Sequence, residues 1–193
     1  GYTPLSSVLF YTNYGKNSME IPTLPSVFYA TEWFLDTALN DGEYLQPMKM
    51  QYLMYLAQGY YAAVSGARRF IPSVFIATAR GPVEPNSYRV YSSARPILQY
   101  QSLDRKTVSF LETIWRRFGA YSADWLFKTI CGHDPYARAL ASGENTEIGI
   151  DDMAAFYSGK SDGFQNPAAS GMRVLRTGTG KTVAVKKWIP AKK

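Results

Sequence analysis

Cysteine and histidine are almost absent from this sequence of 193 residues, which has one of each, Cys131 and His133. A single thiol cannot form an internal disulfide, and it cannot supply a four-cysteine zinc site. The sequence also lacks any run of about 18 apolar residues, so we expect no membrane-spanning helix. Because cysteine is scarce and the first residues lack a signal-peptide pattern, we expect a protein of the reducing cytoplasm.

Acidic residues are scarce in residues 160–193, where eight lysines and arginines face a single acid, Asp162. That segment has a net charge of +7, whereas residues 1–159 have a net charge of −1. A nucleic-acid-binding protein usually spreads its basic residues over a face that also contacts bases. The tail therefore predicts either a solvated segment or weak contacts with an acidic partner such as nucleic acid, made by Lys181, Lys186 and Lys187.

Apolar residues make up 46% of the chain, and their spacing predicts mostly helices. The clearest helix covers 47–66, where Pro47 suits the first turn and Gly66 the end. Gly59 in its middle predicts a close neighbour that would clash with a larger side chain. Further helices are predicted to begin near Ser26, Pro85, Asp104, Ser122, Asp134 and Asp151.

Strands are predicted at 69–82, with a break at Gly81 and Pro82, and in a C-terminal hairpin formed by 172–176 and 182–188. We therefore expect an α+β fold that is mainly α, with a compact helical domain over 26–160. Its small antiparallel sheet is expected to combine 72–78 with the hairpin, and 5–11 is a further candidate strand. Residues 1–25 are interpreted as an N-terminal extension, and 161–193 as a linker followed by the basic hairpin.

The stretch "TGTGKT", residues 177–182, is similar to the phosphate-binding loop of ATPases. That loop requires a glycine where this chain has Leu175, and a helix must follow the lysine and threonine. Here "VAVKKWIP" follows, which is typical of a strand. We interpret the stretch as a hairpin turn in which glycine adopts a positive φ.

The stretch "CGHDP", residues 131–135, places the only cysteine close to the only histidine, as a nucleophile and its base would require. A helix end at Gly132 followed by a helix start at Asp134 explains the same letters, with Cys131 buried. A zinc site would need more ligands than this stretch offers. Paired acids such as Asp151 and Asp152 stand at helix starts, where they complement the helix dipole. We therefore predict no enzymatic activity and no cofactor.

Tyrosine is enriched, with 15 residues, several of which lie within 47–66 or follow Gly81. Tyrosines at such positions are typical of protein–protein interfaces. They are equally typical of a core that keeps its hydroxyl groups at the edge. The sequence leaves both interpretations open.

Two blocks of sequence carry a resemblance to a known family. The segment "MKMQYLMYLAQGYYAAVSGARRF", followed by "IATARGPVEPNSYRVY", resembles the Panacea domain of SocA-like antitoxins from bacterial toxin–antitoxin pairs. The matching letters include the family's AQG block, Ala57 to Gly59, and its GPV-P--Y block, Gly81 to Tyr88. With "LETIWRRFGAYSADWL" and "IGIDDMAAFY", the similarity covers about residues 26–158. The chain departs from the family at Thr78, where tryptophan is usual.

The resemblance implies a non-enzymatic antitoxin that binds and neutralises a cognate toxin protein. It also implies a second partner, an ATP-dependent protease such as ClpXP, when the antitoxin acts as a proteolytic adaptor. Gly59 is expected to permit close helix–strand packing, and Gly81 with Pro82 to fix the exit from the strand. The candidate family-motif and partner-binding residues are Tyr55, Gln58, Gly59, Tyr61, Arg80, Gly81, Pro82, Val83, Pro85, Tyr88, Lys181, Lys186 and Lys187. The alternatives are a nucleic-acid-binding regulator that uses the basic tail, and a hydrolase that uses Cys131 and His133.

Overall fold

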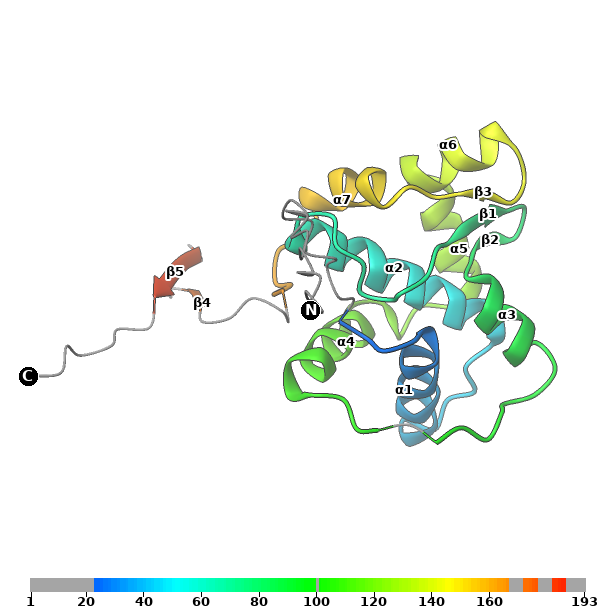
Figure 1. Ribbon diagram of the computed structural model, residues 1–193, viewed down its shortest axis with the longest axis horizontal. Helices are drawn as coiled ribbons and strands as arrows, with labels where there is room; N and C mark the ends of the chain where they lie inside the picture. Colours follow the sequence, from blue (N-terminus) through cyan, green and yellow to red (C-terminus); the bar gives the residue numbers. More distant parts are fainter. Residues whose placement is uncertain (1–22, 100, 167–171, 177–181, 187–193) are drawn as a thin grey trace, which may run out of the picture.

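Helices dominate the computed structural model, which describes residues 23–99, 101–166, 172–176 and 182–186 (Figure 1). The helices of this part of the chain are α1 (Val27–Asn40), α2 (Pro47–Ser65), α3 (Pro85–Tyr91), α4 (Arg105–Phe118), α5 (Ala123–Cys131), α6 (Asp134–Ser142) and α7 (Ile150–Ser158). The strands are β1 (Ile76–Thr78), β2 (Gly81–Val83), β3 (Thr146–Glu147), β4 (Met172–Arg176) and β5 (Thr182–Lys186). The predicted α+β, mainly α fold is confirmed.

Helix α2 runs through the middle of the helical domain, with α6 and α7 on one side and α1 and α4 on the other (Figure 1). Every residue from Lys49 to Ala62 is buried. A helix that is buried all round, rather than along one stripe, lies inside a core instead of on its surface. The other helices are therefore arranged around α2, and the core consists of the side chains that they turn towards it.

The capping residues fixed most helix ends where the sequence predicted them. Asp104 accepts hydrogen bonds from the backbone of Lys106 and Thr107, and Ser122 accepts one from Trp125. Helix α2 ends at Gly66 in the left-handed conformation, with φ of 75°. Two starts lie one residue earlier than predicted. His133, not Asp134, is at the N-cap position of α6, and α7 begins at Ile150 instead of Asp151. None of the helices described is long and apolar enough to cross a membrane.

The sheet beside α2 is antiparallel, with strand order β2-β1-β3. Ile76 pairs with Val83 and with Glu147, so β1 is the central strand. The predicted strand over 69–82 was too long at its start, and Gly81 opens β2 instead of ending a strand. The chain turns at Ala79 and Arg80, between β1 and β2. Strand β3 was not predicted, because two residues are too short to give a period-two pattern.

The predicted C-terminal hairpin is confirmed in its backbone. Strands β4 and β5 pair in antiparallel register from Met172 opposite Lys186 to Arg176 opposite Thr182. They form a two-stranded sheet of their own, so the expectation that they extend the sheet of the helical domain was wrong. The candidate strand at 5–11 lies outside the described residues.

Candidate functional site: the α3 surface and the adjoining pocket

The tyrosines of α2 lie in the core. Tyr55 is 0% exposed and Tyr61 is 1% exposed, and Tyr52 and Tyr60 are also buried. Their rings pack against phenylalanines from other elements, edge-on as Tyr55 does against Phe75 or stacked as Tyr52 does against Phe127. The core interpretation therefore holds for these four tyrosines, and Tyr55 and Tyr61 are not available to a partner.

Gln58 is a buried anchor for the chain between α2 and β1. Its side-chain oxygen accepts hydrogen bonds from the backbone N–H groups of Phe70 and Ile71, at 2.9 and 2.8 Å. Its amide nitrogen donates to the carbonyl oxygens of Ile71 and Ser73, at 3.0 and 3.3 Å. Because one glutamine satisfies these backbone groups, the segment needs no strand partner here. This explains why β1 starts only at Ile76.

Gly59 provides the close contact that its position in α2 predicted, but with a helix rather than a strand. A Cβ atom at Gly59 would lie 2.4 Å from a ring carbon of Tyr157. Tyr157 belongs to α7 and is fully buried. The glycine therefore allows α7 to pack directly on α2, and the expected helix–strand packing was wrong.

The Gly81-Pro82-Val83 block is also buried. Gly81 has φ of 115°, and a Cβ atom there would lie 2.5 Å from the ring of Tyr52. The Tyr52 hydroxyl donates a hydrogen bond to the carbonyl oxygen of Arg80, and burial raises the pKa of Tyr52 to about 12. The tyrosine therefore stays protonated and holds the β1–β2 turn against α2.

A buried carboxylate sets the direction of α3. Glu84 is 0% exposed and caps the helix by accepting hydrogen bonds from the backbone of Asn86 and Ser87. Its side chain also accepts from the hydroxyl of Ser73 at 2.6 Å and from the side chain of Asn86. Gln51 of α2 accepts from the backbone N–H of Glu84. Because the Glu84 carboxylate makes its hydrogen bonds within the protein, it is not available to a ligand.

The remaining described motif residues face outwards on or beside α3. Arg80 and Pro85 are exposed and Tyr88 is half-buried, and a guanidinium nitrogen of Arg80 lies 3.4 Å from the Tyr88 hydroxyl. Arg89, which sequence reasoning missed, is exposed next to Tyr88. We call Arg80, Pro85, Tyr88 and Arg89 the α3 surface. Within the described chain, neither Arg80 nor Arg89 has a carboxylate partner.

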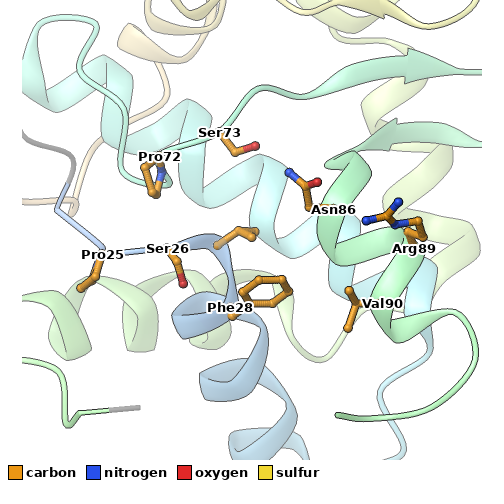
Figure 2. Close-up of a pocket in the computed structure, with 9 residues that line it drawn as sticks. Pro25, Ser26, Phe28, Pro72, Ser73, Asn86, Arg89 and Val90 are labelled. Atoms are coloured by element: carbon orange, nitrogen blue, oxygen red, sulfur yellow. The ribbon is translucent and has the colours of Figure 1, made fainter. Parts of the chain in front are cut away.

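A pocket of about 360 Å³ opens beside the α3 surface (Figure 2). Three segments meet around it: the chain entering α1, the loop before β1, and the outer face of α3. Its lining is Pro25, Ser26, Val27, Phe28, Pro72, Ser73, Asn86, Arg89 and Val90. Asn86, Arg89 and Val90 recur at three- and four-residue steps, so they share one helix face. Arg89 thus belongs to both the pocket and the α3 surface.

The other predicted contact residues, Lys181, Lys186 and Lys187, cannot be added to this surface. Lys181 and Lys187 lie outside the described residues, and only the backbone of Lys186 is described, at the end of β5. The turn 177–181, which resembles a phosphate-binding loop, also lies outside. The chain after it is a strand from Thr182, not the helix that a phosphate-binding loop needs.

An ion cluster around the buried Glu32, which sequence reasoning missed, ties α1 to the segment after α3. Glu32 is 3% exposed, accepts a hydrogen bond from Tyr91 at 2.5 Å, and is bound by the guanidinium of Arg95. Arg95 also pairs with Asp36 at 2.6 Å. Burial and the bond to Glu32 raise the pKa of Tyr91. Glu32 and Asp36, the two acids of α1 in this cluster, therefore pair with Arg95 and not with Arg89.

The stretch 131–135 does not bring a nucleophile and a base together. Cys131 is exposed, although it was predicted to be buried, because α5 turns the preceding Ile130 into the core. Partial burial raises the pKa of its thiol. His133 instead lies 2.8 Å from the Tyr157 hydroxyl, and burial, helped by nearby Lys160, lowers the pKa of His133 to about 4. An activated thiolate needs the opposite shift at cysteine and a histidine contact. In the described part of the chain, no three histidine, cysteine or acidic residues could jointly hold a metal ion.

No family model, no curated protein and no solved structure matches this chain.

Proposed function

We propose that this protein is a cytoplasmic, non-enzymatic antitoxin that binds a cognate toxin protein through the α3 surface and neutralises it. The proposal starts from the resemblance of the AQG and GPV-P--Y blocks to SocA-like antitoxins. The observation that carries it is that the residues of those blocks serve two different purposes. Gln58, Gly59 and Gly81 are used in packing, whereas Pro85 and Tyr88, together with Arg80 just before the second block, reach the surface.

The α3 surface has the properties of a protein-binding surface. It combines arginine with tyrosine, the residue types enriched at the centres of interfaces. Both arginines lack an internal carboxylate partner among the described residues, so pairing with a toxin breaks no existing ion pair. Helix α3 is held by Glu84, Gln51 and the Gln58-anchored loop. A surface fixed in this way loses little conformational entropy when it binds.

Co-expression with the neighbouring reading frame tests this function. If that frame encodes the toxin, it should stop growth alone, and this protein should restore growth and copurify with it. Arg80→Glu should weaken the complex at least tenfold, because a reversed charge then faces the partner. Lys106→Glu makes the same charge change in the first turn of α4 and should leave the complex intact. A harmless neighbour, or a toxin that never copurifies, would refute the proposal.

A role as proteolytic adaptor makes a separate prediction. If this protein delivers its toxin to an ATP-dependent protease such as ClpXP, the toxin's half-life should shorten when the antitoxin is present and lengthen when the protease is deleted. An unchanged half-life in both strains would leave neutralisation by occlusion as the mechanism.

Nucleic-acid binding through the basic tail is the second candidate function, and the +7 charge of residues 160–193 favours it. It predicts DNA binding that weakens steeply as salt rises. Replacing Lys181, Lys186 and Lys187 together by glutamine in the full chain should reduce the slope of log K against log salt by about 3 if each contacts one phosphate. An unchanged slope would exclude these lysines as the binding residues.

A further inference from the structure

The pocket beside α3 is mostly apolar but contains two polar side chains that have no partner among the described residues. Ser73 and Asn86 both donate hydrogen bonds to the buried carboxylate of Glu84. Ser26 stands at the N-cap position of α1, yet its hydroxyl makes no capping hydrogen bond. The side chain of Arg89 has no hydrogen bond or ion pair with any described residue. A ligand in the pocket would therefore find one positive group and one hydroxyl uncommitted.

The walls of the pocket fit an apolar side chain. Val27, Phe28 and Val90 come from two helices, and Pro25 and Pro72 add rigid apolar surface (Figure 2). A closed apolar cavity of about 150 Å³ already holds benzene, so about 360 Å³ leaves room for a leucine or phenylalanine side chain. Removing such a side chain from water would supply the main attraction.

We propose that this pocket receives an apolar side chain of the partner protein while Arg89 pairs with the carboxylate of an acidic residue next to it. Charge complementarity selects this occupant. The carboxylates of Glu84, beside α3, and of Glu32 and Asp36, on α1, are already engaged by Ser73, Asn86 and Arg95. The partner is thus a peptide segment with an apolar residue next to an acidic one. This inference deepens the proposed toxin-binding function, on which it rests for the identity of the partner.

A capped tetrapeptide tests the pocket without the toxin. The full chain, labelled with ¹⁵N, is titrated with acetyl-Gly-Leu-Glu-Gly-amide, and chemical-shift changes are expected at Ser26, Asn86 and Val90. Replacing the peptide's glutamate by glutamine should weaken binding roughly twofold to fivefold, the range of an exposed ion pair. Replacing its leucine by serine should weaken binding by about tenfold or more, because the apolar contact is lost.

Variants of the chain separate the two contributions. Arg89→Gln should lower the affinity for the glutamate peptide to that for the glutamine peptide, and should leave the affinity for the glutamine peptide unchanged. Lys106→Gln should change neither affinity. Salt of 1 M should remove the difference between the two peptides. The proposal is overturned if Arg89→Gln weakens both peptides equally, or if the serine peptide binds as well as the leucine peptide. It is equally overturned if no peptide binds at about 10 mM. Occupation of the pocket by residues 1–22 would give that result and would count against the proposal.

The outcomes distinguish failure of the pocket proposal from failure of the proposed antitoxin function. If the toxin copurifies but the peptides do not bind, the pocket proposal fails and the antitoxin function stands. If the peptides bind as expected but no toxin complex forms, the pocket stands and the toxin is the wrong partner.

Discussion

The interior of α2 and the outer face of α3 use the same kinds of residue for opposite purposes. In α2, Tyr55 and Gln58 are inaccessible, and the polar atoms of Gln58 are fully used by the protein itself. On α3, Tyr88 and Arg89 reach solvent, and Arg89 has no partner among the described residues. The comparison teaches that tyrosine enrichment alone does not identify an interface. What identifies one is whether the side chain reaches solvent, as Tyr88 and Arg89 do and Tyr55 does not.

Loss of the Gln58 side chain should have the largest effect on stability. Gln58→Leu leaves two backbone donors and two backbone acceptors of the segment 70–73 without partners, and we expect a loss of about 3–5 kcal/mol. Urea unfolding would measure it. Gln46→Leu is the control, because Gln46 is exposed and makes no capping bond. A loss below about 1 kcal/mol for Gln58→Leu would show that water replaces these bonds.

The second-largest loss of stability is expected from a larger side chain at the contact between α2 and α7. Gly59→Ala places a methyl group against the buried ring of Tyr157, and we expect it to destabilise the protein by about 1–3 kcal/mol despite the better helix propensity of alanine. Gly159→Ala is the matched control, since nothing lies within 4 Å of its Cβ position. Equal melting temperatures for the two variants would show that α7 can shift away from α2.

Acidic pH should weaken the packing of α7 through His133. In the folded protein the pKa of His133 is about 4, whereas its ordinary value is 6.5, so the unfolded chain binds the proton more readily. Stability should therefore be full above about pH 6.5 and fall as the pH drops towards 4, by up to about 2 kcal/mol for this partly exposed group.

The matched variant for this pH dependence is His133→Asn, which keeps a hydrogen-bonding group beside Tyr157 but cannot titrate. Its stability should lose the slope between pH 6.5 and 4. Asp104, whose pKa is lowered by its bonds to Thr107 and Lys106, contributes mainly below pH 4 and does not obscure the test. The same slope in both proteins would contradict the assignment to His133.

A smaller change in stability, of the opposite sign, is expected when the hydroxyl of Tyr55 is removed. Its hydroxyl is buried without a hydrogen-bond partner among the described residues, and burial raises its pKa, so the phenol is neutral. Tyr55→Phe removes an unsatisfied group and should be neutral or stabilise the protein by about 1 kcal/mol. Tyr157→Phe, which removes the bond to His133, should instead destabilise it by a similar amount. Destabilisation by Tyr55→Phe would reveal a hydrogen bond from that hydroxyl, to the neighbouring Tyr157 or to a bound water.

The α3 surface should be the least sensitive region. Arg80→Gln and Arg89→Gln should each change the free energy of unfolding by no more than about 0.5 kcal/mol, because both side chains are exposed and carry no ion pair in the described structure. Their effect should appear in partner binding only. A larger loss of stability would show that these arginines hold the fold, and would remove the contrast with α2.

Much of the fold followed from local chemistry, whereas the candidate site did not. The ends of α2 and α4 were predictable from Pro47, Gly66 and Asp104, since such residues act on backbone groups within one turn. The length of β1 was not, because it depends on Gln58 bonding a segment twelve to fifteen residues away. Arg89 gave no sequence signal, because a lone arginine on a short helix is ordinary until its neighbours are known.

The sequence by itself determined the helical class, the capped helix ends, the close approach at Gly59 and the absence of a disulfide framework. These depend on residue identity and on spacing along one element. Only the tertiary structure decided which tyrosines are buried, that Cys131 is exposed while His133 contacts Tyr157, and that Ser26, Pro72 and Arg89 line one pocket. The physical reason is distance along the chain: pockets and buried contacts form between residues tens of positions apart, and no local pattern encodes which of them meet.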